Sequence, residues 1–451
     1  MSRSFALTNA ILGMALFTVG CARDVSGADL GPGSGGDGGM IHTNADADFC
    51  NGKGPLVMVG DGQTTQTLCT GQIAQATFQN ALCTCNNAEL AGYLLTRGMN
   101  STNPADNSDG GASVGINNSY AISAGFSDVG GSFDIAGTQG LTLAGYVAVR
   151  GDLRMAGSAT IAGLTTVARN AWLAGTYTDL GPMTIDGDLH HAGAVNAIPL
   201  TVKGKSTQQA VTILPPCDCA AKDILDIGAL VDAAKLQNDN ATIGLMPGAL
   251  DGTLGQVDLT LPCGKFFLTR ISGLGKFTVH VTGRVALFID GDIDATGIVQ
   301  FQLAPSTEID IFVRNNLALT GEMSFGDKSH PAGTRIYVGG TKDVVLIGAA
   351  GFVGNLYAPR ANVTAVGYAE VWGSIFANNF TVPGYTHIIF DRAILTAGST
   401  CGLPPPTTCT LCGVCANGQG CVNNQCVDCK TDADCCGQQS CNNGFCGPVI
   451  Q

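Results

Sequence analysis

The sequence predicts an all-β protein: a parallel right-handed β-solenoid with one covering α-helix and a small disulfide-rich C-terminal module. Three observations lead to this fold class: an 18-residue repeat, a second array of longer apolar segments, and a cysteine-rich C-terminal stretch. The composition agrees, because 63 glycines and only 13% charged residues in a chain of 451 favour short strands and tight turns over long surface helices.

The first array repeats one pattern every 18 residues. "VAVRGDLRMAG" begins at residue 147 and is followed by "TTVARNAWLAG" from 165 and "MTIDGDLHHAG" from 183. Apolar residues alternate with polar ones, which is typical of strands with one buried face. The fixed interval places each strand over its predecessor, as in a solenoid whose neighbouring coils complete one core. Four such coils are visible between residues 129 and 195, and parallel crossovers predict right-handed winding.

The second array begins near residue 265 and has longer, less regular coils. Its strands share an aromatic position flanked by aliphatic residues, which predicts a stack buried on both faces instead of an exposed sugar-stacking surface. The aromatic positions are Phe288, Phe312, Tyr337, Tyr357 and Phe376. Together the two arrays suggest roughly ten coils and a rod on the order of 50 Å long.

A buried outer face needs a covering layer, and the segment 220–236 is the best helical candidate in the chain. Its apolar residues fall on one helical stripe, so we expect this helix to dock on the second array. The stripe consists of Ile224, Ile227, Leu230, Val231 and Ala234.

Leaving out Cys21, the 19 cysteines become an even number, as expected for disulfides in an oxidising compartment. In the tail, four cysteines recur at an interval of 20 residues. Cys412 and Cys436 interrupt this repeat and are expected to pair, and Cys401 is expected to join tail and body. A zinc site at "CTLCGVC" is the alternative, but we predict disulfides and no metal or cofactor. The disulfide candidates are Cys50, Cys69, Cys83, Cys85, Cys217, Cys219, Cys263, Cys401, Cys409, Cys412, Cys415, Cys421, Cys426, Cys429, Cys435, Cys436, Cys441 and Cys446.

Residues 1–21 predict an export signal, because Arg3 precedes an apolar core too short to span a membrane. The core ends in "TVGC", which resembles a bacterial lipobox and implies lipid attachment at Cys21. Ordinary cleavage nearby is the alternative. Residues 22–49 predict a flexible Gly/Asp-rich tether. The expected location is therefore the outer membrane or cell surface, with the membrane contacted through the N-terminal lipid.

Three further regions are expected after the tether. Residues 50–128 predict a cysteine-linked N-terminal cap with a short helix at 72–82, because the open strand edges of a terminal coil need cover. The solenoid is expected over residues 129–400, with the helix between its two arrays. The disulfide-rich tail occupies residues 401–451.

No catalytic residue is predicted. Asp290, Asp292 and Asp294 resemble the first half of a calcium loop, but the residues at its glycine and glutamate positions do not match. An ion pair between Asp290 and Arg314 of the next coil is the simpler expectation. A glycosidase or lyase needs converging carboxylates, and the sequence does not bring its candidates together. Those candidates are Asp186, Asp188, Glu308 and Asp310.

The histidines are expected in structural positions. Adjacent strand residues point to opposite faces, so His190 and His191 should diverge, with His191 on the buried side. His387, in "HIIFD", is expected to help cap the last coil. The six histidines are His42, His190, His191, His280, His330 and His387.

The stretch "GNLYAPRANVTAVGYAEVWGSIFANNFTVPGYTHIIFD", residues 354–391, is similar to the closing coils of choice-of-anchor and pilus-tip-associated β-solenoid domains of bacterial surface proteins. That resemblance implies an adhesive or structural role at the cell surface. The whole arrangement resembles myxobacterial-type lipoproteins with cysteine-rich tails. In the tail, "DADCC" and "CNNGFC" are similar to secreted modules of the knottin or Dickkopf-like kind.

These features predict a non-enzymatic cell-surface lipoprotein that acts as an adhesin or structural spacer, with a glycan or a protein as ligand. The alternative is a carbohydrate-active β-helix enzyme, a polysaccharide lyase or hydrolase. The net charge of −13 and the absence of a basic stripe argue against nucleic acid as a partner.

Overall fold

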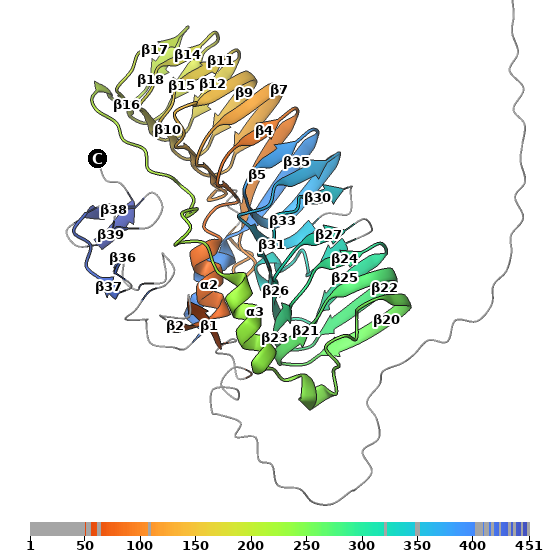
Figure 1. The fold of residues 1–451 in the computed structure, drawn as a ribbon. Helices are drawn as coiled ribbons and strands as arrows, with labels where there is room; N and C mark the ends of the chain where they lie inside the picture. The colour runs from red at the N-terminus through yellow and green to blue at the C-terminus, as the bar shows by residue number, and fades with distance from the viewer. Residues whose placement is uncertain are drawn as a thin grey trace, which may run out of the picture.

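The computed structural model describes residues 50, 56–60, 65–106, 110–319, 323–347 and 352–401, together with parts of 409–448 in the tail. These residues form a parallel β-solenoid of about 13 turns with a separate disulfide-rich module (Figure 1). The fold class expected from the sequence is thereby confirmed. The expected signal, Cys21, the tether and His42 lie outside the described residues. Within the described part, no helix is long and apolar enough to cross a bilayer.

The first array spans residues 82–208, and its strands stack in parallel at the register that the repeat predicts. Val167 pairs with Val149 on one side and with Ile185 on the other. The strands are β3 (Leu82–Thr84), β4 (Ala88–Leu90), β5 (Tyr93–Met99), β6 (Val114–Ile116), β7 (Tyr120–Val129), β8 (Phe133–Ile135), β9 (Leu141–Val149), β10 (Leu153–Met155), β11 (Ala159–Ile161), β12 (Leu164–Val167), β13 (Ala171–Leu173), β14 (Tyr177–Asp179), β15 (Met183–Ile185), β16 (Leu189–His191), β17 (Val195–Ala197), β18 (Leu200–Val202) and β19 (Ser206–Gln208).

The second array spans residues 253–391, and its aromatic column is buried as expected. Neighbouring rings stack, with centroids 5.0 Å apart for Phe288 and Phe312 and 4.7 Å apart for Phe312 and Tyr337. The strands are β20 (Thr253–Leu261), β21 (Gly264–Leu268), β22 (Ile271–Val281), β23 (Arg284–Ile289), β24 (Ile293–Ala295), β25 (Ile298–Leu303), β26 (Glu308–Val313), β27 (Leu317–Leu319), β28 (Met323–Phe325), β29 (Thr334–Val338), β30 (Val344–Ile347), β31 (Phe352–Ala358), β32 (Val363–Val366), β33 (Tyr368–Ala377), β34 (Phe380–Val382) and β35 (Tyr385–Asp391).

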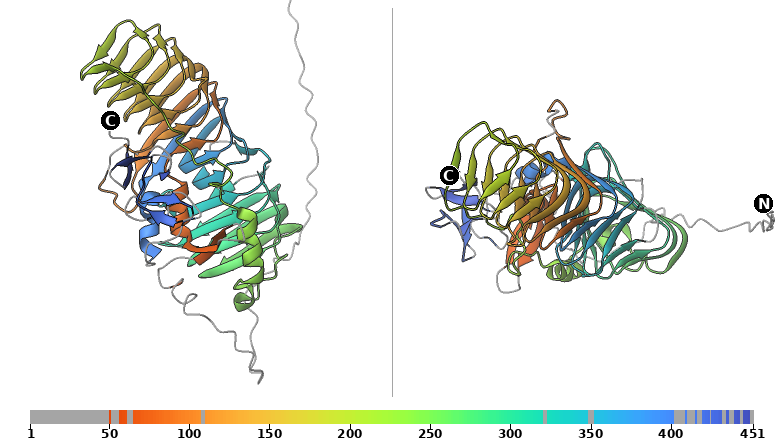
Figure 2. Two further views of the ribbon diagram at one scale, coloured as in Figure 1. Left: turned by 60° about the vertical axis from the view of Figure 1, so that its left-hand side comes forward. Right: turned by 90° about the horizontal axis from the view of Figure 1, so that it is seen from above.

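The chain enters the solenoid in its middle. Strands β33, β34 and β35, which end the second array, pair in parallel with β3, β4 and β5, which begin the first. We call this junction the seam. The views of Figure 2 show it as blue strands lying beside orange ones. An amide ladder at the turns runs through it, because the Asn379 side chain bonds both Asn362 and the backbone N–H of Asn87.

The seam corrects two expectations. Residues 82–99 and 114–129 are coils inside the solenoid, so the segment 50–128 is not a cap over one end, and the solenoid has about 13 turns instead of roughly ten. "HIIFD" does not end the stack, because β35 is covered by β5. The physical reason is the same in both cases: the open edge of the last coil is satisfied by the first coil of the same chain.

Helices cover the aromatic column. α3 (Ile227–Leu236) packs across β21, β23 and β26, and α2 (Thr70–Thr77) lies beside it, after the hairpin of β1 (Leu56–Gly60) and β2 (Thr65–Cys69). Both helices differ from the expected ranges, 220–236 and 72–82. α3 begins late because the Asp226 carboxylate accepts a hydrogen bond from the N–H of Ala229 and caps the helix. Short 3-10 segments complete the cover: η2 (Asn240–Ile243), η3 (Pro331–Gly333) and η4 (Arg392–Cys401).

Disulfides tie the parts together. Two of them staple the connection between the arrays onto the seam coil, and the tail pairs repeat at the same interval as its cysteines. The pairs are Cys50–Cys263, Cys83–Cys217, Cys85–Cys219, Cys409–Cys421, Cys415–Cys426, Cys429–Cys441 and Cys435–Cys446. The tail strands form two hairpins: β36 (Gly420–Val422) with β37 (Gln425–Val427), and β38 (Gln439–Asn442) with β39 (Phe445–Pro448).

Cys69 is also disulfide-bonded, and the six other body cysteines pair among themselves. Its partner therefore lies outside the body, as the odd count of body cysteines requires. The side chain of Cys401, the expected partner from the tail, lies outside the described part of the chain, as do Cys412 and Cys436.

Candidate functional site

Two of the acidic residues considered for an enzyme site lie together, beneath a helix. Asp310 and Glu308 stand on β26, and Arg335 of β29 reaches both, with Nη1 3.1 Å from Asp310 Oδ2 and Nη2 2.7 Å from Glu308 Oε2. The Asp310 side chain is 1% exposed and also bonds Thr70 at the start of α2. Burial raises the pKa of Asp310 even though Arg335 opposes it. This arrangement holds α2 against the sheet and leaves Asp310 closed to a substrate.

The other acidic candidates are far from this pair. Asp186 directly follows β15 and pairs with Lys203 at 2.8 Å, while Asp188 accepts a hydrogen bond from the N–H of Lys205. Many coils separate β15 from β26, because the seam lies between the two arrays. The four acids of the expected set therefore do not form one site.

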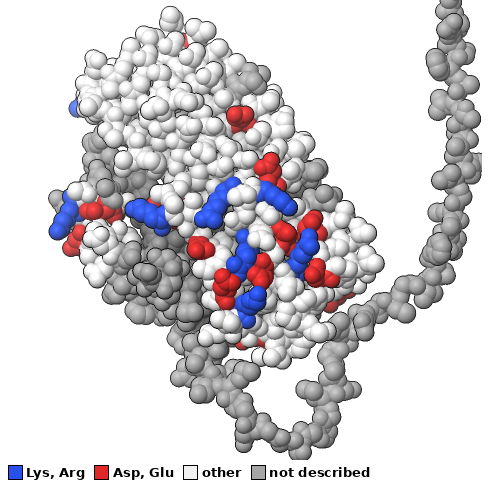
Figure 3. Space-filling view, viewed as in Figure 1, with Lys and Arg blue, Asp and Glu red and all other residues white. Residues whose placement is uncertain are grey.

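The calcium-like acids are each engaged separately. Asp290 pairs with Arg314 at 2.6 Å, as the sequence predicts, and also with Lys235 of α3 at 3.0 Å. Asp292 accepts two hydrogen bonds from Asn316, and Asp294 pairs with Arg270. Figure 3 shows the result on this face: basic and acidic side chains alternate around α3, so the charges neutralise one another locally.

The "HIIFD" segment has a structural role. Asp391 is fully buried and accepts hydrogen bonds from the N–H groups of Ser101, Ala332 and Ala393, which belong to three separate segments. His387 lies four residues earlier on β35, in register with Glu370 of β33. A carboxylate that accepts hydrogen bonds from three backbone N–H groups fixes the three donating segments relative to one another.

The remaining histidines lie apart. His190 stacks on Trp172 with ring centroids 5.6 Å apart, whereas His191 turns to the carbonyl of Gly193, so the two diverge as expected. His191 is partly exposed, although its parity predicts burial. His280 lies 3.7 Å from Asp258, and His330 contacts the hydroxyl of Ser101 at 2.9 Å.

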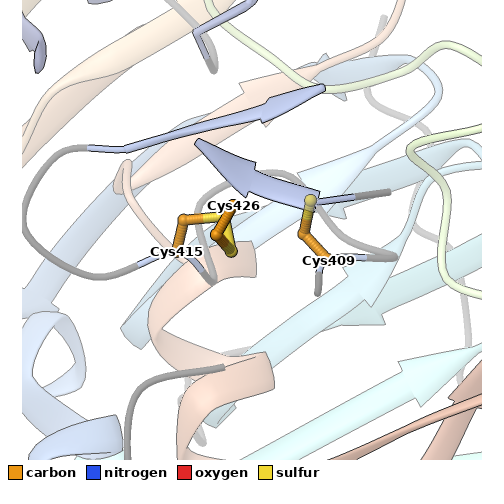
Figure 4. A group of neighbouring side chains, drawn as sticks. All are labelled: Cys409, Cys415 and Cys426. Atoms are coloured by element: carbon orange, nitrogen blue, oxygen red, sulfur yellow. A yellow bond between two sulfur atoms is a disulfide. The ribbon is translucent and has the colours of Figure 1, made fainter. Parts of the chain in front are cut away.

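Within the described residues, only tail cysteines bring three metal-ligating groups within 4.8 Å of one another. Figure 4 shows one such group, Cys409, Cys415 and Cys426, with the disulfide between Cys415 and Cys426. Cys409 is bonded to Cys421. Zinc binds thiolates, and oxidised sulfurs offer none, so the geometry reflects two neighbouring disulfides.

A second aromatic row, exposed on the outside of the solenoid, is the strongest candidate for a functional surface. Tyr368, Tyr385, Tyr93, Phe126 and Tyr146 occupy the same register position on β33, β35, β5, β7 and β9. We call these five residues the exposed ladder. Successive ring centroids lie 4.9, 6.0, 4.5 and 6.3 Å apart. Tyr368 is 51% exposed and Tyr93 is 42% exposed, and the other three rings of the row are half-buried.

A row of glycines positions the exposed ladder. Each of the five rings follows a glycine at a corner of its coil, and the corner glycines lie against one another. A Cβ on Gly92 would stand 1.8 Å from the carbonyl oxygen of Gly384, and a Cβ on Gly125 would stand 1.9 Å from that of Gly92. Only glycine allows this approach, so the coils meet in one register at the corner and the next residue projects a ring. The glycines are Gly92, Gly125, Gly145, Gly367 and Gly384.

Charged side chains flank the first-array half of the exposed ladder on the same face. The Asp128 carboxylate lies between Arg97 and Arg150, with Arg150 Nε 3.3 Å from Oδ1. Burial opposes ionisation of Asp128, but hydrogen bonds from both arginines outweigh it and lower its pKa. The Arg150 side chain remains 46% exposed.

The second-array half has a similar flank. Lys328 Nζ lies 2.6 Å from Glu370 Oε2 and 5.1 Å from the centre of the Trp372 ring. The hydrogen bond from Lys328 lowers the pKa of Glu370, and the Lys328 side chain remains 46% exposed. An aromatic strip with paired charges and one exposed cation at each half is suited to binding a partner that offers both ring-stacking and polar groups.

The exposed ladder is not predicted by the sequence patterns described above, although a repeated dipeptide marks its rings. The dipeptide Gly-Tyr or Gly-Phe recurs in all five segments, in "AGYLL", "AGFSD", "AGYVA", "VGYAE" and "PGYTH". Its ring begins β5, β33 and β35 and lies within β7 and β9. The rings form a single row because Tyr368 and Tyr385 precede Tyr93 along the solenoid axis. This order follows only from the seam.

One family model matches part of this chain. A family model described as a domain of unknown function, DUF7305, matches residues 220–397. This range contains α3 and the whole second array and ends just after the seam strands. No match was found among curated proteins or among solved structures.

Proposed function

We propose that this protein is a non-enzymatic adhesin, exported and held at the outer membrane or cell surface by a lipid on Cys21, which presents the exposed ladder to a ligand. The signal-like residues 1–21 and the tether-like residues 22–49 support export, and so do the disulfides of body and tail. In this proposal, residues 22–49 connect the lipid to the solenoid, whose binding face then stands away from the membrane. The similarity to choice-of-anchor and pilus-tip-associated domains and to myxobacterial-type lipoproteins points the same way.

The observation that carries this proposal is the exposed ladder. Five aromatic side chains stand in single file over five coils, two of them exposed and three half-buried. Contiguous aromatic surface in contact with water is characteristic of binding faces. A rod that serves only as a spacer would need no such row.

The alternative function, a polysaccharide lyase or hydrolase, rests on the convergence of Glu308, Asp310 and Arg335. Glycosidases keep two carboxyl groups about 5 to 10 Å apart with the substrate between them. Here Arg335 fills that place and its side chain is 2% exposed. The arrangement supports a structural role, and the adhesin is the function we propose.

Two experiments test this function. In cells fed a radiolabelled fatty acid, the wild-type chain should carry the label and be digested by protease added outside, whereas Cys21→Ser should lose the label. Purified oxidised protein should then bind members of a glycan or surface-protein panel without releasing reducing ends or unsaturated sugars. Product release abolished by Glu308→Gln would identify an enzyme and overturn the adhesin.

A further inference from the structure

We propose that the exposed ladder binds a linear glycan chain laid along the solenoid axis, with its sugar rings placed against successive aromatic rings. This inference rests on the proposed adhesive function and specifies its ligand. The ladder crosses the seam, so the ligand would contact both arrays at once.

The first argument is the dimension of the row. The five rings cover four steps between parallel strands, and at about 4.8 Å a step the row is about 19 Å long. It is one residue wide, and each ring is separated from the next by 4.5 to 6.3 Å. A linear polymer of ring-shaped units of similar size fits such a file, whereas a globular protein partner contacts a patch that is broad in two directions.

The second argument is the orientation of the rings. Tyr368 and Tyr385 are parallel, with 4° between their planes, but Tyr93 is turned by 46° from Tyr385 and by 65° from Phe126. A continuous parallel stack would hide the face of every inner ring. The turn at Tyr93 opens the stack in its middle, and sugar C–H groups can pack against the electron-rich face of a turned ring. The tyrosines also carry phenol hydroxyls that hydrogen-bond with sugar hydroxyls.

The third argument is the surroundings of the row. Arg97, Asp128 and Glu370 are paired on the flank, so the ligand meets a nearly neutral polar rim. The two exposed cations, Arg150 and Lys328, contrast with the acidic balance of the whole chain, which has a net charge of −13. The hydroxyl or carboxylate groups of a glycan can hydrogen-bond with the charged side chains of this rim. Acidic glycans should bind more weakly as the salt concentration rises.

The test uses the full exported chain, purified with its disulfides formed, and linear oligosaccharides of increasing length from neutral and uronic-acid polysaccharides. Affinity should rise with length until the chain covers the ladder and then level off. Tyr93→Ala and Tyr385→Ala should each weaken binding about tenfold, and the double variant more. Tyr93→Phe should retain most of the affinity, because stacking survives the loss of the hydroxyl.

The control is Leu274→Ala, which removes another exposed apolar side chain, 58% exposed, on the second array away from the ladder. It should bind as the wild type does. Thermal unfolding of every variant checks that the fold is retained, and Tyr93 tolerates truncation because it is partly exposed. Should Tyr93→Ala unfold, Tyr368→Ala at the end of the row replaces it.

The outcomes separate this inference from the proposed function. Glycan binding that is unchanged in Tyr93→Ala and Tyr385→Ala would overturn the ladder as the site and leave the adhesin standing. Binding of surface proteins alone, lost in the same variants, would overturn the glycan as ligand. Cleavage of any oligosaccharide would overturn the non-enzymatic function itself.

Discussion

Arg335 is among the largest fully buried side chains, and its charge is retained inside the protein because two carboxylates and a carbonyl surround it. Its Nε donates to the carbonyl of Ala332 at 3.0 Å, and its other nitrogens reach Asp310 and Glu308. Each group alone would be costly to bury, and their pairing makes the burial tolerable. Because Thr70 of α2 bonds Asp310, these residues hold α2 in place against the sheet.

We therefore expect Arg335→Met to destabilise the protein by about 3 to 5 kcal/mol, since it leaves Asp310 buried and unpaired. Adding Asp310→Leu should recover part of the loss because the orphaned carboxylate is removed. Urea unfolding of the oxidised protein measures both. Arg150→Met, at an exposed pair, is the control and should cost no more than about 1 kcal/mol. Equal stability of Arg335→Met and wild type would contradict the structural role of the cluster.

At the scale of elements, corner glycines determine where coils meet. β5, β7 and β9 begin or turn at glycines whose backbones approach those of the next coil too closely for any side chain. The same corners set the position of the exposed rings, so the register of the sheet and the geometry of the proposed binding row have a common cause. The amide ladder at a neighbouring turn adds hydrogen bonds along the axis.

Substituting one corner glycine should show whether the close approach of the backbones, and not the loss of a glycine in general, affects stability and ligand binding. Gly92→Ala places a methyl group 1.8 Å from the Gly384 carbonyl at the seam, so we expect a lower thermal midpoint and weaker ligand binding together. Gly110→Ala is the matched control, because a Cβ there meets no atom within 4 Å. Differential scanning fluorimetry compares the two variants. If both melt alike, close approach does not constrain the corner.

At the scale of the molecule, the order of the coils in space differs from their order in the chain. The second array precedes the first along the axis, and the connection from β19 to α3 runs back along the solenoid (Figure 1). The two ends of the described body lie close together, because the Gly398 N–H donates to the Gln75 side chain at 3.1 Å and η4 packs against α2. Continuity of the sheet therefore depends on the seam and not on an unbroken chain.

A circular permutant tests this arrangement. Joining residue 401 to residue 65 through a short Gly/Ser linker and opening the chain between 209 and 214 makes chain order match spatial order. Because this chain lacks Cys50 and the tail, Cys263 is replaced by Ser, and we expect the Cys83–Cys217 and Cys85–Cys219 disulfides by mass spectrometry. The far-UV circular dichroism should match that of the unpermuted residues 65–401 with the same Cys263→Ser change, and the thermal midpoint should lie within a few degrees of theirs. Opening the chain inside β7 is the control and should prevent folding. Failure of the first permutant with success of the second would contradict the seam.

Local patterns were sufficient for much of the fold. The alternation around Val149, Val167 and Ile185 predicted both the strands and their pairing, because side-chain parity in a strand depends only on neighbouring residues. The aromatic column of the second array was predicted as buried from its aliphatic neighbours. Helix ranges were less accurate, since the start of α3 depends on the Asp226 cap, and Leu225 just before it donates its N–H to the distant Tyr357 hydroxyl.

The sequence by itself determined that this chain forms stacked parallel coils, a covering helix and a disulfide-rich tail, because each of these follows from short-range periodicity or cysteine spacing. Only the tertiary structure decided that Ile375 pairs with Leu82, which turns the expected cap into a seam. It also decided that Tyr385 and Tyr93 become neighbours in one exposed row. Nothing local encodes these contacts, because the open edge of one coil can pair with the open edge of any other. Which edges pair is decided by the packing of the whole chain.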